Sequence, residues 1–493
     1  MKSRFFVLCF ALAVSVLLTA CLSPPVLESI PIVEAPSSVS SPTVEQTPTL
    51  AAEPTPIYPG AEWQWAESAK ALGWDAEKLA RAKTYAETIG SAAVTIIDNG
   101  IVVDGWGDLT REFKCHSMRK SLLSALYGIY VADGKIDISM TLAELGIDDK
   151  TPLTEDEKQA TVADLLKARS GIYIPAAGEA DSMRADRPKR GSHPPDTFWY
   201  YNNWDFNALG SIFDQLSGEK DIYHAFDKRI AQSIGMQQFR PAHNRYNYVS
   251  YSRHPNYAFR MSAEDLARFG LLFLREGRWN DTQIIPAEWV AESTASYSEI
   301  GPDSGYGYMW WTGEHMGLLA NVDVSGYSYR ASGYGGQELI IPPEHDLIVV
   351  HRADTYAGDM VSEQHIGVLL WMILDAAGKQ AGPKPLVADL ATGERLAGED
   401  LEKALVDGKL WVTTGDDIID IMISPEGDIT LELSGQIVDS GHWRVEEGNF
   451  CLILESFQGV EQCSVVIHDG ELMKFYDSDG FLSLDAFYDY PII

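Results

Sequence analysis

A serine and a lysine stand three positions apart at the start of a long apolar run, CHSMRKSLLSALYG, at residues 115–128. Ser117 and Lys120 are therefore one helical turn apart, so both side chains can lie on one face of a helix. The apolar residues behind them recur at the spacing of a helix packed into a core: Leu122, Leu123, Ala125, Leu126, Ile129 and Tyr130. The run predicts a core helix that begins with a nucleophile and a base, although such a pair is common by chance.

The length and the charge of the chain limit what it can be. Its 493 residues exceed one typical domain, and an apolar content of 45% can bury a sizeable core. The 38 basic residues against 71 acidic residues give a net charge of −33, with no basic stripe that could neutralise phosphates. This balance argues against nucleic-acid binding and indicates a solvated acidic surface.

The first residues are typical of an export signal. Lys2 and Arg4 precede an apolar stretch, residues 5–20, that ends in Leu-Thr-Ala before Cys21. This ending resembles a lipobox, the bacterial motif after which the new N-terminal cysteine is acylated. We expect residues 1–20 to be a lipoprotein signal peptide and Cys21 to carry lipid; an ordinary secretion signal that contains a cysteine is the alternative.

Residues 21–60 predict a tether. They repeat Pro, Ser, Thr, Val and Glu without a helical or strand period, so they cannot bury enough surface to fold. A lipid and a flexible stalk would hold an exported domain at the bacterial cell envelope. Because Leu22 and not Asp follows Cys21, the pattern resembles sorting to the periplasmic side of the outer membrane, if the cell has one.

Residues 61–380 mix strand and helix patterns. A hairpin is predicted at residues 92–107 with Asn99-Gly100 as its turn, and amphipathic helices at 160–172 and 262–279. Two strands at 337–354 and a helix at 362–378 follow. Strands at both ends with helices between them predict one α+β unit, an antiparallel sheet flanked by helices.

Residues 385–493 predict a small all-β domain. Apart from GEDLEKAL, they consist of short alternating segments separated by glycine and aspartate. Cys451 and Cys463 fall in neighbouring strand-like runs of an exported chain, so we expect a disulfide between them. Cys115 is better explained as a small buried residue, and no Cys/His cluster has the spacing of a metal site.

Two further motifs accompany Ser117 and Lys120. Tyr201-Asn202-Asn203 precedes an apolar helical segment, and Ala331-Ser332-Gly333 is expected to open the first strand of the late hairpin. With the first pair they stand in the order S-x-x-K, Y-x-N and x-x-G. Residues 62–378 thereby resemble the serine β-lactamase and penicillin-binding-protein superfamily, in its class C β-lactamase, D,D-peptidase and esterase branch. The resemblance implies a transpeptidase-like fold with a helical subdomain.

The resemblance also implies roles for these residues. Ser117 would be the nucleophile and Lys120 the base that removes its proton. Tyr201 would be a second proton carrier, as a phenolate or through Lys120, and Asn203 would hydrogen-bond Lys120 and the substrate. No metal or organic cofactor is required.

The oxyanion formed in the reaction also needs donors. The backbone N–H of Ser117 would be one, and a second would come from the strand at Ser332, Gly333 or Tyr334. Trp310 is by default a core residue, but it precedes a strand of the expected cleft and is a candidate substrate contact. Arg119 is better explained as a surface or structural residue.

The third motif departs from the superfamily. β-Lactamases and D,D-peptidases carry Lys or His where this chain has Ala331, and that cation helps to hold a substrate carboxylate. Esterases and amide hydrolases of the same branch vary at this position. Arg352, after the late hairpin, is by default a surface or salt-bridged arginine, but it could replace the missing cation.

The sequence therefore favours a membrane-tethered serine hydrolase that acts on small esters or amides through an acyl-enzyme on Ser117. A D,D-carboxypeptidase or β-lactamase, acting on cell-wall peptides or β-lactams, is the first alternative. A non-catalytic envelope protein that binds a ligand in the same cleft is the second. Nothing in the sequence indicates the oligomeric state.

Overall fold

The structure is a computed structural model that describes residues 56–314, 319–385, 393–414, 417–457, 460–477 and 482–489. The predicted signal peptide, Cys21 and the tether as far as residue 55 lie outside these residues. Within the described ranges, none of the helices is long and apolar enough to cross a membrane.

Eight strands of the α+β region, residues 56–385, form one antiparallel sheet in the order β2-β1-β14-β13-β12-β11-β10-β9. The predicted hairpin is present, because β1 pairs with β2 and both Asn99 and Gly100 have positive φ, 49° and 78°. β1 also pairs with β14, which joins the two ends of this region. The strands are β1 (Ala93–Asp98), β2 (Ile101–Gly107), β9 (Ser298–Gly301), β10 (Ser304–Tyr306), β11 (Trp311–Glu314), β12 (Tyr327–Gly333), β13 (Gln337–Ile341) and β14 (Leu347–Arg352).

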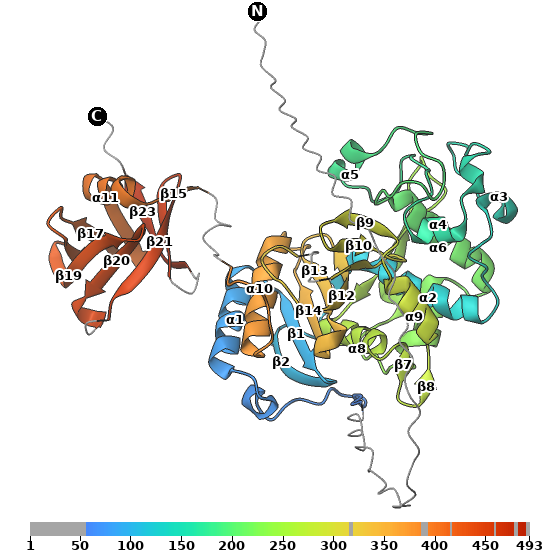
Figure 1. Cartoon of the computed structure of the whole chain (residues 1–493), viewed down its shortest axis with the longest axis horizontal. Coiled ribbons are helices and arrows are strands. Elements are labelled where there is room, and N and C mark those ends of the chain that lie inside the picture. The colour runs from blue at the N-terminus through green and yellow to red at the C-terminus, as the bar shows by residue number, and fades with distance from the viewer. Residues whose placement is uncertain are drawn as a thin grey trace, which may run out of the picture. The chain divides into compact units, whose positions relative to one another are not determined.

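Helices cover both faces of this sheet (Figure 1). On one face, α1 (Ala76–Thr88) and α10 (Glu363–Ala376) pack together over apolar residues such as Ile340 and Val349. On the other face, α8 (Ala263–Leu274) packs on β13 and β14 through the alternate residues Leu339 and Ile348. Strand alternation thus divides the apolar side chains between two cores.

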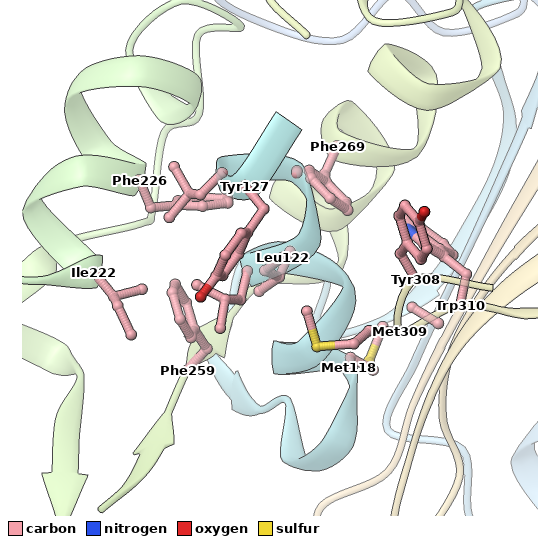
Figure 2. Packing of buried hydrophobic residues seen from close by; sticks show 14 of the residues in the cluster. Met118, Leu122, Tyr127, Ile222, Phe226, Phe259, Phe269, Tyr308, Met309 and Trp310 are labelled. Carbon is pink, nitrogen blue, oxygen red and sulfur yellow. The ribbon is translucent and has the colours of Figure 1, made fainter. Parts of the chain in front are cut away.

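The predicted core helix is α2 (Arg119–Ala132), and it continues a short 3-10 turn, η2 (His116–Met118). Its residues 119–130 are buried all round, because it lies inside the region and not at its surface. Figure 2 shows the packing: Met118 of η2 and Leu122 and Tyr127 of α2 have Ile222, Phe226 and Phe259 on one side and Phe269, Met309 and Trp310 on the other.

The helical subdomain and three small ribbons complete the α+β region. Its remaining helices are α3 (Leu142–Leu145), α4 (Val162–Leu166), α5 (Asp181–Asp186), α6 (Asn203–Ser217), α7 (Ile222–Phe226) and α9 (Ala287–Thr294). The ribbons pair β3 (Phe113–Lys114) with β6 (Arg260–Met261), β4 (Arg245–Asn247) with β5 (Asn256–Ala258), and β7 (Arg278–Trp279) with β8 (Thr282–Gln283).

One predicted helix is much shorter than expected. The pattern at residues 160–172 gives only α4, which ends at Leu166 and not at the glycine of that segment. Ala168 adopts a left-handed backbone, with φ 57°, and turns the chain. Its carbonyl then accepts a hydrogen bond from Tyr200 N. Tertiary contacts of this segment outweigh its helical pattern.

The third motif also lies differently from the prediction. Ala331-Ser332-Gly333 ends β12 and does not open the hairpin, which is formed by β13 and β14. Gly335 and Gly336 have φ values of 79° and 88°, which favour glycine, and they reverse the chain between β12 and β13. The motif therefore lies at a strand end, where the backbone is open to a cleft.

The C-terminal region, described within residues 393–489, is a closed antiparallel barrel. Eight strands, β16 to β23, follow one another in a ring that closes through pairing of β21 with β22, and β15 adds to β21. Cys451 and Cys463 are opposite each other on β20 and β21 and form a disulfide. The predicted fold class, an α+β unit followed by a small all-β domain, is confirmed.

The bounds of the barrel elements are β15 (Glu394–Leu396), α11 (Gly398–Asp407), β16 (Lys409–Thr414), β17 (Asp417–Ile423), β18 (Asp428–Leu433), β19 (Gln436–Glu446), β20 (Asn449–Leu454), β21 (Gln462–Asp469), β22 (Leu472–Tyr476) and β23 (Leu482–Asp489). Its apolar core includes Leu401 and Leu405 of α11 together with Trp443, Phe450 and Phe475. The helix therefore closes over the apolar interior of the strands.

Candidate active site

A cleft of about 1280 Å³ opens beside the start of α2. Its walls come from η2 and α2, from residues 178–183, from the start of α6, from β11 and the end of β12, and from the ribbons β3-β6 and β4-β5. Ser117, Lys120, Tyr201 and Asn203 all line it, as does Ser332. The structure thus brings the three sequence motifs to one cavity.

Ser117 and Lys120 form the centre of the cleft. Lys120 Nζ lies 2.7 Å from Ser117 Oγ and 2.7 Å from the Tyr201 hydroxyl oxygen. The first distance follows from the one-turn spacing of the two residues at the η2–α2 junction. The second requires the tertiary fold, since Tyr201 lies 81 positions further along the chain.

Lys120 lies in a setting that disfavours its charged form. Its side chain is buried, and its ammonium nitrogen lies 4.5 Å from the centre of the Tyr201 ring and 4.8 Å from that of Phe206. Burial, with the nearby Arg119 guanidinium as a second cause, lowers the pKa of Lys120 well below its usual value. A neutral amine at this position can accept the proton of the Ser117 hydroxyl.

Tyr201 is held by aromatic neighbours. Its ring stacks on Trp311 with centroids 5.2 Å apart and meets Tyr306 edge-on at 6.0 Å. Burial raises the pKa of Tyr201 to about 12, although the hydrogen bond to Ser117 and the charge of Arg119 act in the opposite direction. The hydroxyl therefore keeps its proton at neutral pH, which favours proton relay through Lys120 over a standing phenolate.

The turn that presents Tyr201 is held by a buried polar network that the sequence analysis missed. Asn202 caps α6, since its side chain accepts a hydrogen bond from Trp204 N. Its amide also donates to Ile172 O and to Asp205 Oδ1, and Ser170 donates to the same carboxylate oxygen. Asparagine before a helix and aspartate within its first turn are the sequence signal for such a cap.

Asn203 lines the cleft but does not make the expected contact with Lys120. Its amide nitrogen donates instead to Gly178 O, at 2.7 Å. Its side-chain oxygen is buried without a hydrogen-bond partner among the described residues, and so it is free to accept a hydrogen bond from a ligand. The prediction for this residue is therefore wrong about Lys120, while its place in the cleft leaves a substrate contact open.

Gly333 brings the end of β12 against the backbone of the nucleophile turn. A Cβ atom at this position would lie 2.4 Å from Cys115 O and 3.2 Å from Ser117 N. No side chain fits there, so glycine is required by close approach. Ser332 lines the cleft and donates to Glu338 Oε1 at 2.6 Å, while the Tyr334 side chain is exposed. The backbone N–H groups of Ser117 and of this strand end are the candidate oxyanion donors.

His116 lines the cleft and was not singled out from the sequence. It adopts a left-handed backbone, with φ 48°, directly before Ser117, and its Nε2 lies 2.9 Å from Thr355 Oγ1. Burial, together with the charges of Lys114, Arg352 and Lys120, lowers the pKa of His116 to about 4, so its ring is neutral at neutral pH. A positive φ at a non-glycine residue is a conformation that a sequence pattern does not reveal.

The family model for beta-lactamase matches residues 77–356, which is more than half of the 493-residue chain. The chain belongs to the beta-lactamase family. The members of this family are usually serine hydrolases, and its model spans the serine, tyrosine and strand-end motifs that line the cleft.

Among solved structures, this beta-lactamase-family chain is similar to two penicillin-binding-protein structures. One is the penicillin-binding protein from Bacillus halodurans, at 17% identity over 55% of this chain and 95% of that chain, with a TM-score of 0.43. The other is the octameric penicillin-binding protein homologue from Pyrococcus abyssi, at 15% identity over 84% and 98% of the two chains, with a TM-score of 0.46. A comparison with curated proteins gave no match.

Two further predictions for this beta-lactamase-family cleft are wrong. Trp310, just before β11, is fully buried in the core, whereas Trp311, the first residue of β11, lines the cleft. Arg352 is also fully buried and does not line the cleft. Its guanidinium donates to Gln337 Oε1 and to Lys114 O, so it braces the backbone before the nucleophile and not a substrate.

The residue that departs from the family at the third motif lies in the core. Ala331 is buried in the same core as Leu339, its partner across the strands, and it does not line the cleft. Arg119, next to Lys120, is the buried cation nearest in sequence to the dyad. It donates to Asn207 Oδ1 at 2.8 Å and lies over the Tyr257 ring at 4.0 Å. It is a buried residue of the site, not a surface arginine.

No cluster of His, Cys, Asp or Glu that could hold a metal ion occurs in the part of the chain that the structure describes. The chemistry available to these residues is that of a buried amine between two hydroxyls. A neutral amine can take a proton from one hydroxyl while the other hydroxyl passes a proton on. The arrangement suits nucleophilic attack by serine on a carbonyl group.

Proposed function

We propose that the protein is a serine hydrolase of esters or amides that works through an acyl-enzyme on Ser117. One observation carries the proposal: the Lys120 amine lies at hydrogen-bond distance from both Ser117 and Tyr201 and has a lowered pKa. A serine hydroxyl needs a base to become a nucleophile, and a neutral lysine beside it is such a base.

In the acylation step, Ser117 Oγ attacks the substrate carbonyl carbon while its proton passes to Lys120 Nζ. The oxyanion that forms is held by the N–H of Ser117 and an N–H of the β12 end around Gly333. The proton then passes through the Tyr201 hydroxyl to the leaving alcohol or amine, and the bond to that group breaks. Ser117 is left as an ester of the acyl group.

In the deacylation step, water takes the place of the leaving group. The water gives one proton to the hydrogen-bonded Lys120–Tyr201 pair as its oxygen attacks the ester carbonyl carbon. The carbonyl oxygen again becomes an oxyanion. The bond to Ser117 Oγ then breaks, the serine regains a proton, and the free acid leaves. Because each proton moves between groups that already touch, little rearrangement is needed.

The substrate class follows from the third motif. Because β12 carries Ala331 at the sequence position of the family cation, it supplies no charge-assisted hydrogen bond, worth roughly 1.5–3 kcal/mol, to a substrate carboxylate. This favours esters and amides over penicillins and acyl-D-Ala-D-Ala, whose carboxylate lies close to the bond that is cleaved. The burial of Arg352 supports the same preference, since this guanidinium does not reach the cleft to replace the cation.

The experiment compares purified wild-type protein with Ser117→Ala on 4-nitrophenyl butyrate, penicillin G and an acyl-D-Ala-D-Ala peptide. We expect ester hydrolysis by the wild type, a loss of at least about 10⁴-fold in Ser117→Ala, and a fluorophosphonate adduct on the Ser117 peptide in mass spectrometry. Faster turnover of penicillin or of the peptide than of the ester would establish the β-lactamase or D,D-carboxypeptidase alternative. No turnover and no adduct would leave a ligand-binding protein.

We also propose that Cys21 is acylated and that residues 22–60 tether the hydrolase to the bacterial cell envelope. The Leu-Thr-Ala-Cys ending and the Pro/Ser/Thr-rich segment after it support this proposal. In cells, Cys21→Ser should move the protein from the membrane pellet to the soluble fraction. Unchanged fractionation would contradict the lipid anchor.

A further inference from the structure

One wall of the cleft carries three cations that come from two ribbons. Lys114 of β3 is paired in register with Arg260 of β6, and Arg245 of β4 is paired with Ala258 of β5. Lys114, Arg245 and Arg260 all line the cleft. We call these three residues the cationic wall.

The strand period explains how the wall forms. Asn256, Ala258 and Arg260 are two residues apart and all line the cleft, as do Arg245 and Asn247 on the neighbouring strand. Alternate residues of a strand face the same side, so one face of each ribbon is turned to the cavity. That face presents guanidinium, ammonium and amide groups around the small side chain of Ala258.

The charges on this wall are not neutralised by the protein. Lys114, Arg245 and Arg260 form no ion pair with a carboxylate of any described residue; Arg260 instead lies over the Tyr356 ring, 4.9 Å from its centre. Burial lowers the pKa of Lys114, and the charges of Arg245, Arg119 and Arg260 lower it further. The repulsion among these cations is therefore not relieved by the protein itself.

The carboxylates that line the same cleft are paired with arginines elsewhere. Glu179 pairs with Arg187 at 2.5 Å, and Glu363 pairs with Arg330 at 3.3 Å. The third, Asp181, pairs with Arg184. In a chain with a net charge of −33, the unmatched charge of this cavity is positive. Such a cavity attracts an anion from solution.

A second observation comes from inside the cleft. Arg119 lines it and is only 3% exposed, yet its Nη1 has no hydrogen-bond partner among the described residues. A buried guanidinium nitrogen without a partner is uncommon, and a ligand oxygen would satisfy it. The cationic wall and this buried donor lie in the same cavity.

We propose that the cationic wall is an anion subsite that holds a carboxylate of the ester or amide substrate. The proposal rests on the proposed function and extends it to the substrate class: an ester or amide with a carboxylate away from the bond that is cleaved. Arginine binds carboxylates with two parallel hydrogen bonds, which makes it suited to this role. The binding charge is thus supplied by β3-β6 and β4-β5 and not by the third motif on β12.

The test uses two pairs of esters that differ only in charge. In the first pair the charge is on the acyl side: 4-nitrophenyl hydrogen adipate against its methyl ester. In the second it is on the leaving group: 4-acetoxybenzoate against 4-acetoxybenzamide. Each kcat/KM is divided by the rate of hydroxide-catalysed hydrolysis of the same ester, so intrinsic reactivity cancels. The charged member should be preferred at least about tenfold in one pair, which also tells which side of the substrate meets the wall.

The variant Arg245→Gln/Arg260→Gln should bring this charged-to-neutral ratio down to about one. Arg278→Gln is the matched control, because Arg278 is an exposed arginine of β7 that does not line the cleft; the ratio should stay unchanged. Ratios near one in both wild-type pairs would overturn the proposal. A high ratio that survives the double substitution, or falls equally in the control, would also overturn it.

A binding measurement distinguishes failure of the anion subsite from failure of the proposed function. In Ser117→Ala, calorimetry with monomethyl adipate should show binding that weakens at least about tenfold when Arg245 and Arg260 are also replaced by Gln. If neutral esters are hydrolysed through Ser117 without a charge preference, the subsite alone is wrong. If monomethyl adipate binds to the wall but no ester is hydrolysed, the proposed function is wrong and the subsite stands.

Discussion

The α+β region and the barrel are both built on antiparallel sheets, but they differ in what they bury. The α+β region buries charged and polar side chains that include Arg119, Lys120, Asp205 and Glu338. Among the described residues of the barrel, Ser464 is the one polar side chain that is buried. Its core is otherwise apolar, and the Cys451–Cys463 disulfide links β20 to β21.

The difference indicates where chemistry takes place. A buried charge is costly, so a fold keeps one where a network or a reaction requires it. Glu338 illustrates this: burial raises its pKa to about 7, although Arg330 and the Ser332 hydroxyl stabilise the carboxylate. Ser332 lines the cleft, so this buried carboxylate supports the strand end at the site. We expect turnover to depend on the α+β region and stability of the barrel to depend on its own core.

Among the substitutions that test this difference between the α+β region and the barrel, Lys120→Met should have the largest effect on turnover. The change removes the base and keeps an apolar chain of similar length in a buried position, so ester hydrolysis should fall by about 10²–10⁴-fold. Steady-state kinetics with 4-nitrophenyl butyrate measure the loss. Lys83→Met, on the exposed side of α1, is the control and should keep full activity. Wild-type rates in Lys120→Met would remove this lysine from its role.

Gly333→Ala should have the second largest effect on turnover. The new methyl group would meet Cys115 O and would push the end of β12 from the nucleophile turn. Loss of one oxyanion donor costs roughly 10²–10³-fold in kcat, and we expect a fall within that range. Gly60→Ala is the control, since a Cβ there has no atom within 4 Å. An unchanged kcat in a folded Gly333→Ala protein would exclude this strand end from the oxyanion site.

Arg119→Gln should change the pH profile more than the maximal rate. The reaction needs neutral Lys120, so activity falls as the pH drops below the pKa of this lysine. Because the Arg119 charge lowers that pKa, its removal should raise the pKa and move the acid limb of kcat/KM to higher pH. The measurement is the pH profile of ester hydrolysis in wild type and variant. A shift to lower pH, or none, would contradict the assigned electrostatics.

The double change Cys451→Ser/Cys463→Ser should leave turnover within about twofold of the wild type. The disulfide spans a sequence separation of 12, and its loss should lower the stability of the barrel by about 3 kcal/mol in the chain-entropy model. Denaturant unfolding measures this change, and thiol titration of the unreduced wild type checks the bond itself. A parallel collapse of ester hydrolysis would show that the two regions are not separate in function.

Local patterns in the sequence predicted much of the fold and the centre of the site. The spacing of Ser117 and Lys120 places them on one turn, and strand alternation with Asn99-Gly100 predicts a hairpin. These features depend on residues a few positions apart, where backbone geometry alone relates the side chains. The order of the three motifs was enough to indicate the family and the candidate cleft.

The sequence was less informative where an environment decides the outcome. The helix predicted at residues 160–172 is cut to α4 by contacts of Ala168 with the segment before α6. The choice between Trp310 and Trp311 depends on how the chain enters β11, and a single-residue shift reverses it. For Arg352 and Asn203, the partners became visible only in the folded chain.

By itself, the sequence determined the class of protein: an acidic chain of 493 residues with a Ser-x-x-Lys helix, a Tyr-x-Asn motif, an Ala-Ser-Gly motif and a separate β-rich end. Tertiary structure alone decided that Lys120 is buried between two hydroxyls and that Lys114, Arg245 and Arg260 share a wall. The physical reason is that pKa values and charge clusters depend on burial and on distances between residues far apart in the chain. Sequence periodicity carries neither quantity.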